Sequence, residues 1–177
     1  MKKVLIFVII LLITSCAASK NMLIIIPQDT LDEIPMNTTK VIVTNDQSLI
    51  ENYNKSYQVL LINDYRIEND NKEMGYISAS KMDIGDTNVR LNVVCNNNQI
   101  AVTSEWKAGT NSEIWATAVS GIPVDSDWNN AVWTKQYNKP NVAFAKAVQF
   151  AKEMGTKISY ITPEKKPIDK NGDPLYN

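Results

Sequence analysis

Apolar and polar residues follow two different periods near the start of the chain's central part. Lys40–Thr44 is rich in β-branched residues and predicts a strand. Over residues 47–62, apolar side chains recur at helical spacing, which predicts an amphipathic helix. Ser48 and Glu51 stand three residues apart at the start of that segment, the spacing of a capping box. The pattern therefore begins with a strand followed by a helix.

Short alternating segments then predict antiparallel strands. Residues 65–68 and 75–80 form one hairpin, because the polar residues 69–72 between them are typical of turns. A further strand is predicted over residues 113–119.

The clearest hairpin surrounds the pair Asn96-Asn97. A two-residue loop there pairs Val93 with Ile100, so the apolar sets of both strands share one face. Asparagine tolerates the left-handed conformation that a tight hairpin turn requires. Cys95 then points inward, and we interpret it as a small core residue.

The last elements are a helix and a short strand. Pro140 suits a first helical turn, residues 142–154 carry an apolar stripe, and Gly155 is placed to end the helix. Residues 157–160 predict a final strand. The resulting order predicts an α+β fold over residues 40–162, an antiparallel sheet of about five to six strands with two helices packed on one face.

The first residues have the pattern of a secretory leader. A basic start precedes an apolar run over residues 4–13, which reaches only about 15 Å as a helix, too short for a hydrocarbon core of ~30 Å. Ile13-Thr14-Ser15-Cys16 resembles a bacterial lipobox. The resemblance implies cleavage before Cys16, lipid on that cysteine, and a membrane anchor through it. The alternative is an ordinary signal peptide with a chance cysteine.

This resemblance divides the chain into four parts. Residues 1–15 are a signal peptide, 16–39 a lipidated tether, 40–162 the α+β domain and 163–177 a flexible tail. Similarity to lipoproteins of enteric type favours the outer membrane, because no Asp follows the lipidated cysteine. Whether the domain faces the periplasm or the cell surface stays open.

Four segments stand out between Pro35 and Trp106: Thr39–Val43, Tyr65–Glu68, Gly75–Ser78 and Asn98–Val102. On these segments, the chain from Pro35 through Trp106, and again from Val142 to Met154, resembles small lipoproteins of Bacteroidetes. The fold of those proteins is likened to the sheet-and-helix half of the TATA-binding protein. The likeness is architectural and implies no DNA binding.

Composition narrows the possible chemistry. There is no histidine, which excludes Ser-His-Asp and Cys-His catalysis and every zinc site that needs imidazole. The formal net charge of −1 offers no basic field for nucleic acid. No phosphate-binding or dinucleotide motif is present, so we expect no cofactor. Asp125, Asp127 and the Asp169–Asp173 segment are interpreted as solvated turns rather than metal ligands.

All four tryptophans fall within residues 106–133, with Tyr137 close behind. We predict a candidate binding surface at Trp128, Trp133 and Tyr137, because clustered aromatic residues form recognition sites. Trp115 is expected to be more structural, since it lies in the strand predicted over 113–119. The alternatives are rings that fill the core at one end of the sheet, and rings seated at the membrane interface.

These patterns favour a lipid-anchored cell-envelope protein with a non-catalytic binding or scaffolding domain, whose partner is an envelope protein or a glycan. One alternative is an envelope enzyme that uses carboxylate or Ser/Lys chemistry. Another is an accessory or immunity-type lipoprotein that binds a protein.

Overall fold

The computed structural model describes residues 28–82, 87–109, 113, 118–120, 127–134 and 138–163. Its elements are α2 (Gln28–Glu33), β1 (Lys40–Thr44), α3 (Leu49–Ile62), β2 (Arg66–Asn71), β3 (Tyr76–Lys81), β4 (Thr87–Asn96), β5 (Gln99–Ala108), β6 (Asn129–Asn130), α5 (Lys139–Met154) and β7 (Lys157–Ile161).

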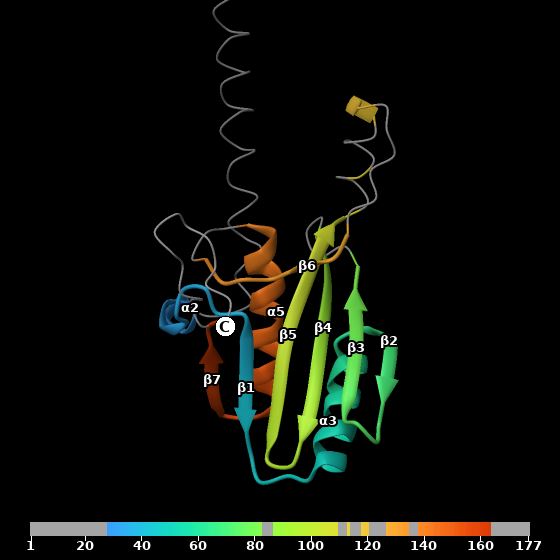
Figure 1. Cartoon of the computed structure of the whole chain (residues 1–177), viewed down its shortest axis with the longest axis vertical. Coiled ribbons are helices and arrows are strands. Elements are labelled where there is room, and N and C mark those ends of the chain that lie inside the picture. Colours follow the sequence, from blue (N-terminus) through green and yellow to red (C-terminus); the bar gives the residue numbers. More distant parts are fainter. Residues whose placement is uncertain are drawn as a thin grey trace, which may run out of the picture.

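The strands form one antiparallel sheet in the order β2-β3-β4-β5-β1-β7, and β6 pairs with the far end of β5. The two long helices, α3 and α5, lie side by side on the same face of this sheet (Figure 1). This arrangement confirms the predicted α+β class, an antiparallel sheet with two helices on one face.

Helix α3 begins where its sequence predicts. The Ser48 side chain accepts from the Glu51 backbone N–H while the Glu51 carboxylate accepts from the Ser48 backbone, a complete capping box. The buried face of the helix differs from the predicted apolar face. Asn52 and Ser56 are fully buried there, whereas Leu61 is 51% exposed. Polar contacts with the sheet therefore rotate the helix away from its most apolar side.

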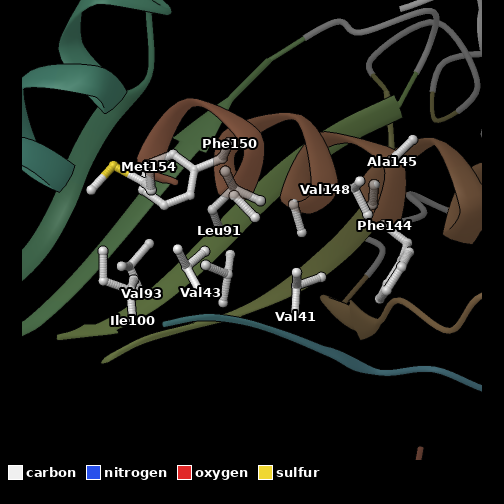
Figure 2. Packing of buried hydrophobic residues seen from close by; sticks show 14 of the residues in the cluster. Val41, Val43, Leu91, Val93, Ile100, Phe144, Ala145, Val148, Phe150 and Met154 are labelled. Carbon is white, nitrogen blue, oxygen red and sulfur yellow. The ribbon is translucent and has the colours of Figure 1, made fainter. Parts of the chain in front are cut away.

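Helix α5 supplies most of the helical side of the core. Pro140 lies in its first turn and Gly155 ends it, as predicted, and the Asn138 side chain caps its start. Its apolar side chains point at the inner positions of the central strands (Figure 2). The residues labelled there include Phe144, Val148, Phe150 and Met154 of the helix and Val41, Val43, Leu91, Val93 and Ile100 of the sheet, all members of one buried cluster.

The β4–β5 hairpin has a different register from the predicted one. Val93 lies opposite Val102, and Ile100 lies opposite Cys95, so the predicted pairing of Val93 with Ile100 is wrong. The turn is Asn97-Asn98, one residue later than predicted. The apolar faces still coincide because a shift of two residues preserves the side of the sheet on which each side chain lies.

The connection between β1 and α3 selects this turn. The Asn98 backbone N–H donates to the Gln47 carbonyl over 2.8 Å, and the Asn98 carbonyl accepts from the Asn45 N–H over 3.0 Å. The Asn97 side chain accepts from the Leu49 N–H over 2.9 Å. These partners lie about fifty residues earlier in the chain, so the hairpin sequence alone does not reveal them.

Two further predictions are corrected where the structure describes the residues concerned. The tether predicted over 16–39 is wrong for its last part, because Leu31 and Ile34 are only 2% and 1% exposed and belong to the core. The strand predicted over 113–119 is wrong for residues 113, 118 and 119, which are helical. Cys16, the leader and residues 164–177 lie outside the described residues. Among the described helices, none has the length and apolar character to cross a membrane.

Candidate functional site

The sheet face opposite α3 and α5 carries the candidate site. Along β4 the inner residues Val89 and Leu91 are fully buried beneath the helices, so Arg90 and Asn92 project from the other face. No described helix covers this second face, as Figure 1 shows for the side toward the viewer. We call it the open face.

Trp128 lies over the open face and is half-buried. The guanidinium carbon of Arg90 is 4.1 Å from the centroid of its ring, and the Lys107 ammonium is 5.5 Å from the same centroid. Both distances allow cation–π attraction. Because Arg90 projects from β4 and Lys107 from β5, contacts with two strands of the sheet hold the Trp128 ring in place.

Two carboxylates fix Arg90 beneath this ring. Its Nε donates to Glu68 Oε2 over 2.8 Å, and an Nη donates to Glu105 Oε2 over 3.1 Å. The Glu68 contact crosses β3 above Ser80, which is only 2% exposed and lies opposite Arg90 in the register. The small serine leaves room for the ion pair. Arg90 therefore has few rotamers available, and Trp128 rests on a pre-formed platform.

A polar strip continues from this platform along the open face. Asn92 Oδ1 accepts from the Tyr76 hydroxyl over 3.2 Å and from Ser78 Oγ over 2.9 Å. These two bonds orient the amide, and its NH₂ group donates to no residue in the described part of the chain. Asn130, two residues after Trp128, lies opposite Glu105, so its exposed amide belongs to the open face, whereas Asn129 lies opposite Trp106 on the other face. The strip therefore offers amide and hydroxyl groups beside an aromatic ring.

Trp133 is a core residue. It is 3% exposed, and its ring centroid is 6.0 Å from that of Phe144. Its backbone pairs with Asn37 and Thr38, and its indole N–H has no hydrogen-bond partner among the described residues. The predicted surface of Trp128, Trp133 and Tyr137 is therefore not one surface, because Trp133 belongs to the core. Tyr137 and Trp115 lie outside the described residues.

Tyr53 and Asp70 form a second polar contact, between α3 and β2. The Tyr53 hydroxyl donates a short hydrogen bond to Asp70 Oδ2, and the ring lies 6.0 Å from that of Tyr57. Burial, and then the bond to Asp70, raises the pKa of Tyr53 well above its usual value. The hydroxyl thus stays protonated at neutral pH and serves as a structural donor rather than a nucleophile.

Cys95 is fully buried, as predicted for a core residue. Ser56 Oγ lies 3.5 Å from its sulfur, and burial raises the pKa of the thiol, with the Ser56 contact opposing. The protonated thiol is a poor nucleophile. Within the described residues, no three His, Cys, Asp or Glu side chains come together to hold a metal ion.

Sequence analysis singled out Trp128 but missed the residues that hold it. Arg90, Glu68, Glu105 and Lys107 come from three strands, and only the true register brings Arg90 opposite Glu105. No family model, curated protein or solved structure matches this chain. The function of this protein must therefore be inferred from the geometry of the open face.

Proposed function

We propose that this protein is a lipid-anchored component of the bacterial cell envelope whose domain binds a neutral saccharide chain, without catalysis, on the open face around Trp128. The observation that carries the proposal is the half-buried Trp128 ring held over Arg90, with Arg90 itself held by Glu68 and Glu105.

Pre-organisation makes this ring a suitable binding group. A tryptophan offers a large flat apolar surface with a polar N–H, and a ring already fixed to a sheet loses little conformational freedom on binding. Saccharides present an apolar C–H face and a rim of hydroxyl groups. The Trp128 ring suits the apolar face, and the Asn92 and Asn130 amides suit the hydroxyl groups.

The charges of the platform also favour a neutral ligand. Arg90 and Lys107 are balanced by Glu68 and Glu105, and both carboxylates bond to Arg90. A strongly charged polymer would meet no net field of the opposite sign here.

The leader supports the anchoring part of the proposal. The basic start, the short apolar run and the sequence ending at Cys16 suit cleavage and lipidation at that cysteine. The absence of Asp after Cys16 favours the outer membrane. The resemblance to small lipoproteins of Bacteroidetes agrees with this placement. Cys16→Ala should abolish fatty-acid labelling and release the protein from the membrane fraction; continued labelling of the mutant contradicts the anchor.

The binding part is tested with immobilised polysaccharide purified from the envelope of the native host. Trp128→Ala should weaken retention of the full-length protein by about 30-fold, the equivalent of ~2 kcal/mol for a residue at the centre of a site. Gln58→Ala, an exposed change on α3, is the matched control and should bind like the wild type. Equal retention of the wild type, Trp128→Ala and Gln58→Ala contradicts the proposal. If the protein is retained by immobilised envelope proteins but not by the polysaccharide, its partner is a protein instead.

A further inference from the structure

A small cavity lies on the helix side of the sheet, on the opposite side from the open face. Its polar lining consists of Asn63, Tyr65, Lys81, Lys146, Gln149 and Glu153, and its volume is about 30 Å³. Lys81 ends β3 on the inner face, where Ile77 and Ala79 are fully buried. The α5 residues recur three or four positions apart and so share one side of that helix.

Two ammonium groups line this cavity. Lys81 Nζ donates to the Asn63 carbonyl over 2.8 Å and lies 3.7 Å from the carboxylate of Asp64, which is largely solvent-exposed. Lys146 Nζ donates to Gln149 Oε1 over 3.0 Å. An ammonium group carries three N–H donors, so both lysines retain donors beyond these contacts.

The surroundings of Lys146 disfavour its positive charge. Burial lowers the pKa of Lys146, the neighbouring charge of Lys81 lowers it further, and Glu153 opposes both effects. Glu153 forms no ion pair with either lysine in the described part of the chain. Its Oε2 instead accepts from Asn63 Nδ2 over 2.9 Å. Lys81 and Lys146 thus form no ion pair with Glu153, although its carboxylate lines the same cavity.

Tyr65 adds a third donor to the same cavity. The residue is 7% exposed, and its hydroxyl has no hydrogen-bond partner among the described residues. Burial and the nearby charge of Glu153 raise its pKa, so the hydroxyl stays protonated. Its oxygen is not fully buried, so the hydroxyl can donate to water or to a ligand oxygen.

We propose that this cavity binds a carboxylate-sized oxyanion between the ammonium groups of Lys81 and Lys146, with Tyr65 as a further donor. Its volume matches a few small atoms, since a buried water needs at least ~10–15 Å³ of such space. The ligand class is the carboxylate of a small organic acid, or bicarbonate. The site is separate from the open face, and saccharide binding can fail without affecting it.

Residue-resolved amine labelling of the full-length protein tests the site. The protein is treated with an amine-reactive ester in sodium acetate or in sodium chloride of equal ionic strength, and labelled peptides are quantified by mass spectrometry. Bound acetate should slow labelling of Lys81 and Lys146 by about tenfold at ten times its Kd. Lys72, exposed in the β2–β3 turn, should react equally in both salts. A Kd of 1 mM corresponds to a binding free energy of about 4 kcal/mol, so roughly 100 mM acetate would saturate even a weak site. If neither lysine is selectively protected up to that concentration, the proposal is overturned.

Variants and a second anion sharpen the outcome. Lys81→Gln should abolish most of the acetate protection at Lys146, whereas Lys157→Gln, an exposed change on β7, should leave it intact. Thermal melting curves of both variants check that the fold survives. Unchanged protection in a folded Lys81→Gln variant overturns the two-lysine site. Inorganic phosphate, which is larger, should protect less than acetate, and stronger protection by phosphate contradicts the assigned ligand size.

Discussion

The side-chain amide of Asn52 on α3 donates a 2.9 Å hydrogen bond to the backbone carbonyl of Asn96 at the end of β4. Asn52 is fully buried, and its Oδ1 accepts from Asn45 Nδ2 over 2.7 Å. One side chain therefore joins a helix, the end of a hairpin and the loop after β1. This junction places the hairpin turn, and with it the register that aligns the open face.

Replacing Asn52 should therefore destabilise the fold more than its size suggests. Asn52→Ala removes a fully buried amide and leaves the Asn96 carbonyl and the Asn45 amide without this partner, at a cost of about 1–3 kcal/mol in the free energy of unfolding. Asn54→Ala, an exposed change two residues further along α3, should cost no more than ~0.5 kcal/mol. Urea unfolding measures both. Equal losses would show that the Asn52 contacts add nothing to stability.

The turn itself gives a second prediction. Asn98 has a φ of 63°, in the left-handed region, and its side chain is exposed. Asn98→Gly keeps this conformation accessible and should change the free energy of unfolding by no more than ~0.5 kcal/mol. Asn98→Val forces a β-branched residue into the same conformation and should cost about 1–3 kcal/mol. If the two variants unfold at the same urea concentration, the left-handed turn at Asn98 is contradicted.

The tryptophans should separate in stability. Trp133→Ala removes a buried ring packed on Phe144 and should cost about 3–5 kcal/mol. Trp128→Ala removes a half-buried ring that rests on two half-buried cations outside the core, so the melting temperature of this variant should fall far less. Thermal unfolding of the two variants measures the difference, and a loss at Trp128 as large as at Trp133 would place both rings in the core.

Local signals predicted the two long helices, α3 and α5, well. The capping box of Ser48 and Glu51 and the Pro140 and Gly155 ends of α5 depend on neighbours within a few residues, and all are present in the structure. The strand Lys40–Thr44 is also predicted, because β-branched content is a local property.

Long-range contacts account for what sequence reasoning missed. The predicted hairpin register places Arg90 opposite Thr103, whereas the observed register places it opposite Glu105. The ion pair of Arg90 and Glu105 under Trp128 therefore could not be predicted from the sequence. Lys81 and Lys146 meet at a cavity only because α5 packs back across the sheet. The clustering of tryptophans in sequence likewise does not tell that Trp133 turns inward while Trp128 lies on the open face.

Acidity should weaken the start of α3. The Glu51 carboxylate accepts hydrogen bonds from the Ser48 backbone N–H, which has the larger effect, and from the Ser48 hydroxyl. These bonds hold the pKa of the Glu51 carboxyl below the ordinary value of 4.5. A carboxyl whose pKa is lowered on folding stabilises the fold above its unfolded pKa, and the contribution is lost as pH falls through the folded pKa.

The matched variant for this prediction is Glu51→Gln, which keeps an acceptor oxygen but does not titrate. Between about pH 7 and pH 3, the wild type should lose more unfolding free energy than the variant. Urea unfolding at both pH values measures the loss. The same loss in both proteins would contradict a stabilising charge at Glu51.

The claim that the open face binds a saccharide is tested most directly by the indole N–H signals of the ¹⁵N-labelled full-length protein in detergent micelles. Each signal is assigned from single tryptophan variants, and soluble fragments of envelope polysaccharide are then titrated in. The account predicts that the Trp128 signal shifts and saturates while the buried Trp133 signal stays in place. A Trp128 signal that does not move, or a binding curve unchanged by Trp128→Ala, contradicts it.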